Sequence, residues 1–332
     1  MKNMISQVLW WSGMPQKIIA QAAGHFFFVV NYHRVCPQEV QGIQFPGFFD
    51  LRTPPPLFAD QLAYFNEQFE VVSLADLFGK AGHKPKLLIT FDDGYRDNYD
   101  FAFPLLQKFN MPALFFVATE VLEAKRLLWD NQFFYTLERV GLKKTQDFFK
   151  SVFPDENLMG DSVDHVSRVL FRCFAKNISS HEKRMRVIED FADITKTFAP
   201  STFVQNFYLS AEQIKSMAKA GMAFGAHTHQ HALLPTSTDL EVSFELSQSK
   251  NALETILNHK ISSFCYPSGQ FNPAVTAAVG QHYSTAFTTQ EHKNSATQNP
   301  LLLGRFNVSS QSPHYLAFEL SEWKNKLKTI LG

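Results

Sequence analysis

Two adjacent carboxylates, Asp92 and Asp93, end an apolar run in the stretch LLITFDDG. Two acids this close repel each other, and the pKa of one rises unless a cation lies beside them. A divalent metal ion that binds one carboxylate removes this conflict and leaves the other as a general base. The structural alternative is an Asx turn or a helix N-cap, because Asp-Gly is common in turns.

A second group of candidate ligands, His227, His229 and His231, lies in the stretch GAHTHQHALL. Imidazole is the commonest metal ligand among side chains. The four-residue spacing of His227 and His231 brings both rings to one point on a helical turn or a tight loop. One Asp and two His leave positions for water and substrate on a metal that lowers the pKa of water and polarises a carbonyl. The two groups together favour a hydrolytic metal centre.

The elements that must position these groups alternate between short buried strands and helices. The run FFFVVNYH is typical of a strand buried on both faces. Strands are predicted at 26–33, 70–74, 87–91 and 111–118, and helices at 57–69 and 97–109. This alternation predicts an α/β fold, a parallel sheet or barrel. In such folds the loops at the carboxyl ends of the strands form the active site.

The alternation of strands and helices stops between about residues 120 and 207, where charged and Phe-rich segments have helical spacing. We expect a helical insertion there, serving as a lid or a dimerisation surface. Alternation resumes at Ser210, a good N-cap for a helix that Gly221 ends. Helices are then predicted at 240–258, 273–280 and 316–331, and strands in MAFGAH, ISSFCYP, STAFT and RFNVS.

Composition narrows the class of protein. The 332 residues suffice for one large α/β domain or two smaller ones, and 45% of them are hydrophobic. Lys+Arg and Asp+Glu both number 31, so no overall charge favours nucleic acid as a partner. The 34 Phe residues indicate an aromatic core. The three cysteines, Cys36, Cys173 and Cys265, form no CxxC pair, which argues against a disulfide framework and a thiolate zinc site.

The N-terminal region lacks a clean signal-peptide pattern, because polar residues and Pro15 interrupt each apolar run. The run Phe26–Val30 is too short to cross a bilayer. We therefore expect no transmembrane segment and a cytoplasmic protein, at most peripheral to a membrane. Trp10 and Trp11 are the residues that would touch a membrane surface, and packing on the domain is the favoured alternative.

The sequence resembles the polysaccharide deacetylases, carbohydrate esterase family 4 with the NodB homology domain. TFDDG (Thr90–Gly94) matches the first family motif, HTHQH (His227–His231) matches H-[ST]-x-x-H, and YHRV and FCYPSGQFN fit in order. The resemblance divides the chain into an N-terminal extension, 1–24, and a deacetylase-like domain, 25–332, with the insertion at about 120–207. It implies an irregular parallel (β/α) barrel.

The resemblance also implies roles for the candidate residues. Asp92 is the general base, while Asp93, His227 and His231 hold one divalent metal ion, zinc or alternatively cobalt or nickel. Thr228 would brace the His loop, and His229 occupies a variable position of the motif. The implied reaction removes an N-acetyl group, in some members an O-acetyl group, from a sugar of a polysaccharide or glycolipid. Metal-bound water attacks the acetyl carbonyl, so the expected partner is an N-acetylated glycan or lipid-linked sugar.

The third family motif departs from the usual Arg-x-Pro-aromatic pattern. The corresponding stretch is CYPSG, a YPxG variant found in exopolysaccharide-type relatives, and it lacks the arginine that orients the base. We expect Arg305 to supply that charge beside Asp92, with an ordinary surface ion pair as its alternative. Tyr266, Ser268 and Gly269 are expected near the substrate, where backbone N–H groups would bind the oxyanion.

The general acid, a late histidine in the family, has no clear match here. His314 and His282 are candidates by position alone, and His33 is expected to line the pocket after the first strand. Trp129 and Asp130 are candidates for contact with sugar, with core packing as the favoured role of the tryptophan.

Other functions remain to be weighed against a deacetylase. A catalytically weak or inactive carbohydrate-binding relative would explain the altered motifs, although the complete metal triad argues against it. A glycosidase built on Asp92 and another carboxylate would leave the His group unexplained. An aspartyl-phosphate phosphatase needs Asp-x-Asp, which FDDGY lacks.

Overall fold

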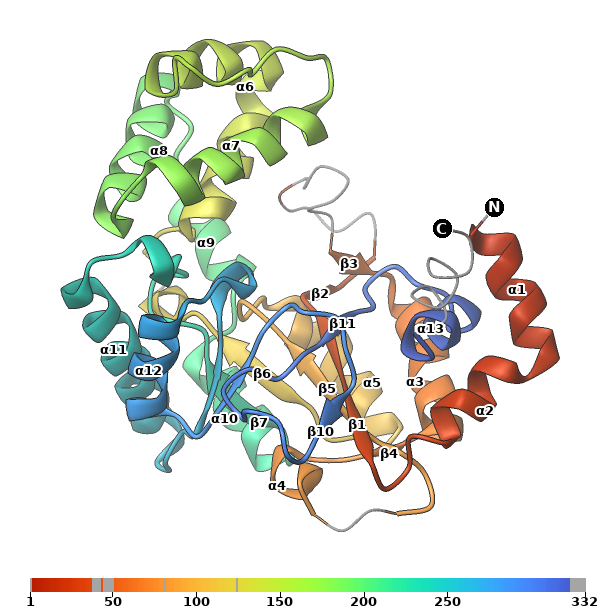
Figure 1. The fold of residues 1–332 in the computed structure, drawn as a ribbon. Helices are drawn as coiled ribbons and strands as arrows, with labels where there is room; N and C mark the ends of the chain where they lie inside the picture. Colours follow the sequence, from red (N-terminus) through yellow and green to blue (C-terminus); the bar gives the residue numbers. More distant parts are fainter. Residues whose placement is uncertain (1, 38–42, 44–50, 80–81, 124, 323–332) are drawn as a thin grey trace.

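The structure is a computed structural model that describes residues 2–37, 43, 51–79, 82–123 and 125–322. Its centre is a curled sheet surrounded by helices (Figure 1). The strand order is β10-β1-β5-β6-β7-β8-β9, with β11 also beside β1 and β4 beside β5. The strands are β1 (Phe26–Tyr32), β4 (Glu70–Val71), β5 (Lys86–Phe91), β6 (Leu114–Val117), β7 (Ala223–Ala226), β8 (Ser263–Cys265), β9 (Thr285–Phe287), β10 (Asn294–Ser295) and β11 (Phe306–Asn307).

Parallel pairing dominates this sheet. Among the described strands only β10 runs antiparallel, to β1, so the sheet is mixed. A separate small sheet joins β2 (Arg34–Val35) and β3 (Arg52–Thr53) in parallel. The predicted α/β class with a barrel-like sheet is confirmed, and the antiparallel β10 is the feature that the prediction of a parallel barrel missed.

The two faces of the central strands bury different groups. On β1 and β5, Phe28 and Ile89 belong to the large core under the helices, whereas Val29 and Leu88 belong to a smaller apolar cluster on the other face. Side chains alternate along a strand. On the second face, the residues nearer the carboxyl ends of the strands are polar: Asn31 on β1, Thr90 on β5, and Asp92 directly after β5. A polar layer therefore follows the smaller apolar cluster on this face.

Helices connect and cover the strands. In chain order they are α1 (Lys2–Ser12), α2 (Met14–Ala20), α3 (Pro55–Gln68), α4 (Leu74–Leu77), α5 (Phe103–Lys108), α6 (Trp129–Val152), α7 (Val163–Asn177), α8 (His181–Thr195), α9 (Ser201–Phe207), α10 (Ala211–Lys219), α11 (Asp239–Leu257), α12 (Pro273–His282) and α13 (Pro313–Leu320). A π-helical turn (Asn98–Ala102) precedes α5, and short 3-10 turns lie at 119–123, 234–236 and 267–269. Ser210 caps α10 in a capping box, as its sequence predicts.

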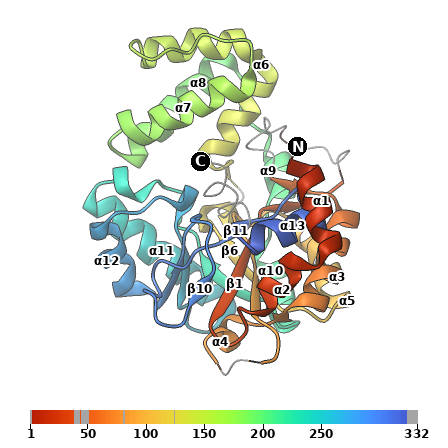
Figure 2. The ribbon, with the colours of Figure 1, turned by 45° about the vertical axis from the view of Figure 1, so that its right-hand side comes forward.

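Helices α6 to α9 lie between β6 and β7 in the chain, within the range predicted to be a helical insertion. Figures 1 and 2 show α6, α7 and α8 as a group standing beyond one end of the sheet. A core of aromatic rings holds this group together: Trp129, Phe133, Phe149, Phe174 and Phe191 are all buried. The abundant Phe residues thus extend the large core of the sheet into the helical group.

The N-terminal helices α1 and α2 lie beside α13, the last helix that the structure describes (Figure 1). Helices α1 and α2 were not predicted, and they contact α13. Trp10 packs against the Tyr64 ring at 5.5 Å, whereas Trp11 is 85% exposed. The predicted helix 316–331 begins at Pro313 and ends at Leu320, and its part from 323 onward lies outside the described residues. No helix within the described ranges combines the length and apolar character needed to cross a membrane.

Candidate active site

The carboxyl ends of several strands place the candidate residues around one cavity of about 840 Å³. His33 follows β1, Asp92 and Asp93 follow β5, and His227 and His231 follow β7. All five line the cavity. Its size lies in the upper part of the usual ~300–1,000 Å³ range of small-molecule sites. The sheet therefore brings together residues that are up to about 200 positions apart, as parallel strands do in α/β enzymes.

Asp93, His227 and His231 form a compact group of ligand atoms. Asp93 Oδ1 lies 3.4 Å from Nε2 of His227 and 3.4 Å from Nε2 of His231. The three ligand atoms lie within 4.8 Å of one another, and all three residues are buried. Atoms bound at about 2.1 Å to a tetrahedral zinc ion are about 3.4 Å apart. Asp93 Oδ1 is also buried without a hydrogen-bond partner, so this donor set fits a divalent cation.

Burial and neighbouring charges shift the pKa values of these ligands. Burial alone would raise the pKa of Asp93, but the neighbouring His227 and His231 rings outweigh it and hold the pKa below its usual range. Burial would lower the pKa of His231, but the Asp130 and Asp93 carboxylates raise it to about 9. Asp93 is therefore held as a carboxylate, and the carboxylates around His231 favour positive charge at this position.

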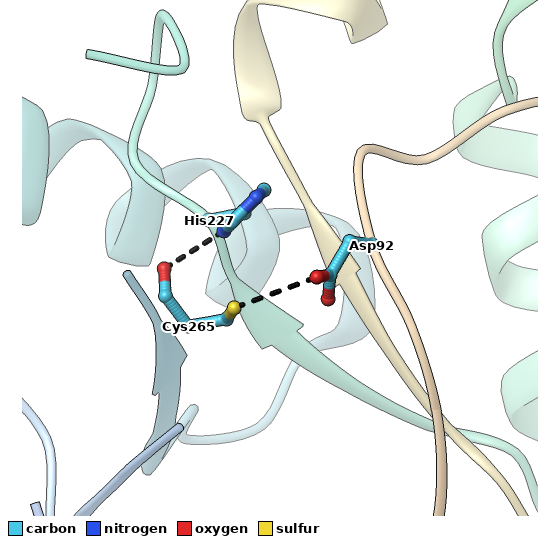
Figure 3. Close-up of side chains that lie close together, drawn as sticks. All are labelled: Asp92, His227 and Cys265. Carbon is cyan, nitrogen blue, oxygen red and sulfur yellow. Dashed lines mark hydrogen bonds between the residues drawn. The ribbon is translucent and has the colours of Figure 1, made fainter. Parts of the chain in front are cut away.

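A second possible ligand set, Asp92, His227 and Cys265, lies beside the first (Figure 3). Asp92 already accepts hydrogen bonds at both oxygens from Arg305. Burial raises the pKa of the Cys265 thiol well above its ordinary value, so the thiolate that a metal requires is disfavoured. His227 Nδ1 lies 2.8 Å from the Cys265 carbonyl oxygen, which leaves Nε2 directed at Asp93. The Asp93 set is therefore the better metal site.

The first turn of α6 supports His231 from the helical group. Asp130 Oδ2 lies 3.1 Å from His231 Nδ1, and the indole N–H of Trp129 donates to the His231 carbonyl at 2.9 Å. A carboxylate beside the distal nitrogen of a ligating imidazole fixes the ring and raises its basicity. Trp129 is buried, in agreement with the core-packing role that the sequence favours for it. Asp130, the other candidate for contact with sugar, lines the cavity.

The loop that carries the histidines is a tight turn rather than a helix. Thr228 and His231 have positive φ angles of 61° and 56°, a conformation that costs non-glycine residues free energy and is often found at functional sites. The Thr228 hydroxyl accepts the Ala232 N–H, as expected of a residue that braces the loop. Glu245 accepts the N–H groups of His229 and Gln230 at 2.7 and 2.8 Å. These contacts hold the loop in its strained form.

Asp92 and Arg305 form a buried, bidentate ion pair. Two guanidinium nitrogens lie 2.8 Å from the two carboxylate oxygens, and the side chains are 1% and 3% exposed. Burial would raise the pKa of Asp92, but Arg305 outweighs it and lowers the pKa. Arg305 also donates to the Asn31 side chain at 2.8 Å and to the Thr90 hydroxyl at 3.2 Å. Both residues belong to the polar layer that follows the smaller apolar cluster. Arg305 thus takes the place expected for it, and the surface ion-pair alternative is excluded.

The other residues expected near the substrate differ in their placement. His33 Nε2 lies 3.9 Å from Asp92 Oδ2, and burial lowers the pKa of His33, which keeps the imidazole neutral. Tyr266 and Ser268 line the cavity. The N–H of Tyr266 donates to Phe287 in the sheet, and the N–H of Gly269 donates to the Tyr266 carbonyl. Those two N–H groups are therefore engaged and poorly suited to bind an oxyanion.

The late histidines lie elsewhere. His314 is on α13 and contacts Ser312, while His282 ends α12. Neither lines the cavity. His229 also points away from it, since its Nδ1 lies 2.9 Å from the Thr119 hydroxyl. The contact between Asp130 and His231 could not be predicted from the sequence, because no fixed spacing relates the start of α6 to the His loop.

Comparison with known proteins identifies relatives of this chain. The family model described as "Polysaccharide deacetylase" matches residues 79–152 and 174–286. YxkH of Bacillus subtilis (strain 168), assigned by its name to the same kind of protein, is 23% identical over 224 residues. These residues are 67% of this chain and 51% of YxkH, so this chain spans about half the length of that relative.

Solved structures share the fold. A deacetylase of Streptococcus pyogenes, PplD, in complex with acetate superposes with a TM-score of 0.58 at 19% identity, over 89% of this chain and 98% of that one. A polysaccharide deacetylase from Bacillus cereus gives 0.57 at 17% identity, over 89% and 68%. At these identities the structures establish the fold. The family model, which covers more than half of the chain, confirms the expected class, and this protein belongs to the polysaccharide deacetylase family.

Proposed function

We propose that this protein is a metal-dependent hydrolase that removes acetyl groups from N-acetylated sugars of a polysaccharide or glycolipid. One observation carries the proposal: Asp93, His227 and His231 converge in the cavity where Arg305 holds the carboxylate of Asp92. Family membership supports the same reaction class, hydrolysis of a carbon–nitrogen bond.

Asp93 Oδ1 and the two Nε2 atoms would hold the cation, which we propose to be zinc. Bound there, a divalent ion supplies a Lewis acid that polarises the acetyl carbonyl and lowers the pKa of water. Asp130 and the Cys265 carbonyl keep the two rings oriented for this role.

Asp92 would act as the general base. Arg305 donates to both carboxylate oxygens and the Cys265 thiol donates to Oδ2, so Oδ1 keeps a further lone pair with which to accept a proton from the attacking water. The departing amine must gain a proton as the carbon–nitrogen bond breaks. We assign this transfer to Asp92 and His33, whose side chains lie 3.9 Å apart and line the same cavity.

The test is acetate release together with metal content. Purified protein is expected to carry one metal ion per chain and to release acetate from tetra-N-acetylchitotetraose or a related N-acetylated glycan. Removal of the metal with dipicolinate should abolish release, and zinc, cobalt or nickel should restore it. Full activity without metal would refute the proposal. A chain that binds one ion and glycans but releases no acetate would be the inactive carbohydrate-binding relative.

His231→Ala is expected to lower metal occupancy from about one ion per chain to below one-tenth, because the site loses one of three protein ligands. His229→Ala is the matched control, since that residue lies in the same loop but contacts Thr119 instead of the cavity. Elemental analysis of both variants is the measurement. Unchanged stoichiometry in His231→Ala would remove His231 from the ligand set.

A further inference from the structure

Helix α7 presents a basic and partly apolar face to the active-site cavity. Arg168, Arg172 and Lys176 follow one another at four-residue intervals, so they share one side of the helix. All three line the cavity, together with Phe171 and Ala175 of the same helix. The cavity that holds Asp92 and Asp93 is thus bounded on another side by cations of the helical group.

The positive charges of this face are only partly compensated. Arg168 pairs with Asp164 one turn earlier, at 2.8 Å. Arg172 and Lys176 are exposed and have no ion-pair partner among the residues that the structure describes. Two exposed cations in a concave wall create a local positive potential, and a concave shape with low-dielectric walls concentrates it.

Most acidic residues that line the cavity already have partners in the reaction centre. Asp92 is paired with Arg305, Asp93 lies between two imidazoles, and Asp130 is paired with His231. The remaining acidic lining residue, Glu291, comes from the connection between β9 and β10, and within the described part of the chain no ion pair joins it to Arg172 or Lys176. No carboxylate of the reaction centre is therefore available to neutralise Arg172 and Lys176.

Aromatic rings accompany these charges. Phe171 is half-buried and stacks on Phe134 at 5.3 Å, with 17° between the ring planes, and both rings line the cavity. An aromatic face suits the apolar side of a sugar ring or an aliphatic chain. A guanidinium and an ammonium suit phosphate or carboxylate, and Arg binds either one in a bidentate manner.

We propose that the substrate is an anionic saccharide, whose phosphate or carboxylate group contacts Arg172 and Lys176 while its acetamido sugar lies at Asp92 and Asp93. This inference rests on the proposed deacetylase function and specifies its substrate class. The reaction centre needs only the acetamido group, so the helical group would contact the part of the saccharide next to the acetamido sugar. Figures 1 and 2 show α7 in that group, beyond the end of the sheet.

Three probes test the charge requirement. Tetra-N-acetylchitotetraose is neutral, its 1-phosphate carries phosphate, and a tetrasaccharide of alternating N-acetylglucosamine and glucuronic acid carries carboxylate. Acetate release gives kcat/KM for each probe, and isothermal titration gives the Kd of each for the full-length protein. We expect at least one anionic probe to exceed the neutral one by about tenfold or more, the effect of one charge-assisted hydrogen bond. The anionic probe with the higher kcat/KM shows whether phosphate or carboxylate is the group that the protein binds.

The matched variants are R172Q/K176Q and K144Q/K150Q. Both remove two exposed lysine or arginine charges from the helical group, but Lys144 and Lys150 lie on α6 and do not line the cavity. R172Q/K176Q should reduce the anionic-to-neutral ratio of kcat/KM to within about twofold of one. K144Q/K150Q should leave the ratio as in the unaltered protein. Melting temperatures of both variants establish that the fold is kept.

The outcomes separate this inference from the proposed function. A ratio near one for both anionic probes in the unaltered protein, or a preference that persists in R172Q/K176Q, would overturn the inference while leaving a deacetylase. If no probe releases acetate but the Kd values show the anionic preference and its loss in R172Q/K176Q, the proposed reaction fails and the anion site stands.

Discussion

Asp92→Asn is expected to lower the turnover number for acetate release by about 10²–10⁴-fold, the usual contribution of a general base. The amide keeps the size of the side chain but loses its ability to accept the proton from water. Metal occupancy should stay near one ion per chain, because Asp93 and the two histidines are unchanged. Steady-state kinetics and elemental analysis on the same preparation measure the two effects.

Asp93→Asn is the informative comparison for Asp92→Asn. The two carboxylates are adjacent, yet Asp93 Oδ1 faces two imidazole nitrogens while both Asp92 oxygens face Arg305. Asp93→Asn should lose metal and turnover together, whereas Asp92→Asn should lose turnover alone. Near-full activity in Asp92→Asn would exclude it as the base, and metal loss in that variant would reassign it as a ligand.

Arg305→Ala is expected to reduce the free energy of unfolding by about 3–5 kcal/mol, because it leaves the buried Asp92 carboxylate without its partner. Arg305 is 1% exposed and also donates to Asn31, so solvent cannot replace it. Turnover should fall as well, since Asp92 loses the group that orients it and lowers its pKa. Both stability and activity are therefore expected to respond.

Chemical denaturation of the variant and the unaltered protein measures the stability effect. Arg96→Ala is the matched control, because Arg96 pairs with Asp100 at 3.2 Å with both side chains more than one-third exposed. Such pairs contribute about 1 kcal/mol or less. Arg305→Lys should recover part of the stability but not the two-point geometry. A loss below about 1 kcal/mol in Arg305→Ala would show that the ion pair contributes little.

The sequence by itself determined the local character of most strands and helices. Continuous apolar runs marked β1, β5 and β6 as strands buried on both faces, since only a sheet covered on both sides gives that pattern. Ser210 marked the start of α10 through its capping chemistry. Motifs directly after strands also indicated which residues would gather at one end of the sheet, because parallel strands share a carboxyl edge.

Only the tertiary structure decided which distant side chains touch. Arg305 is expected beside Asp92 only through the family resemblance, and the structure brings the two together across 213 residues. No sequence pattern relates Asp130 to His231, which come from different connections between strands. Hydrophobic periodicity reports whether a position is buried, and it carries no information about the partner that a buried charge finds. The orientation of α7 over the cavity depends likewise on how the buried aromatic rings of the helical group pack against one another. Local pattern therefore fixed the elements, and the packing between them fixed the chemistry of the site.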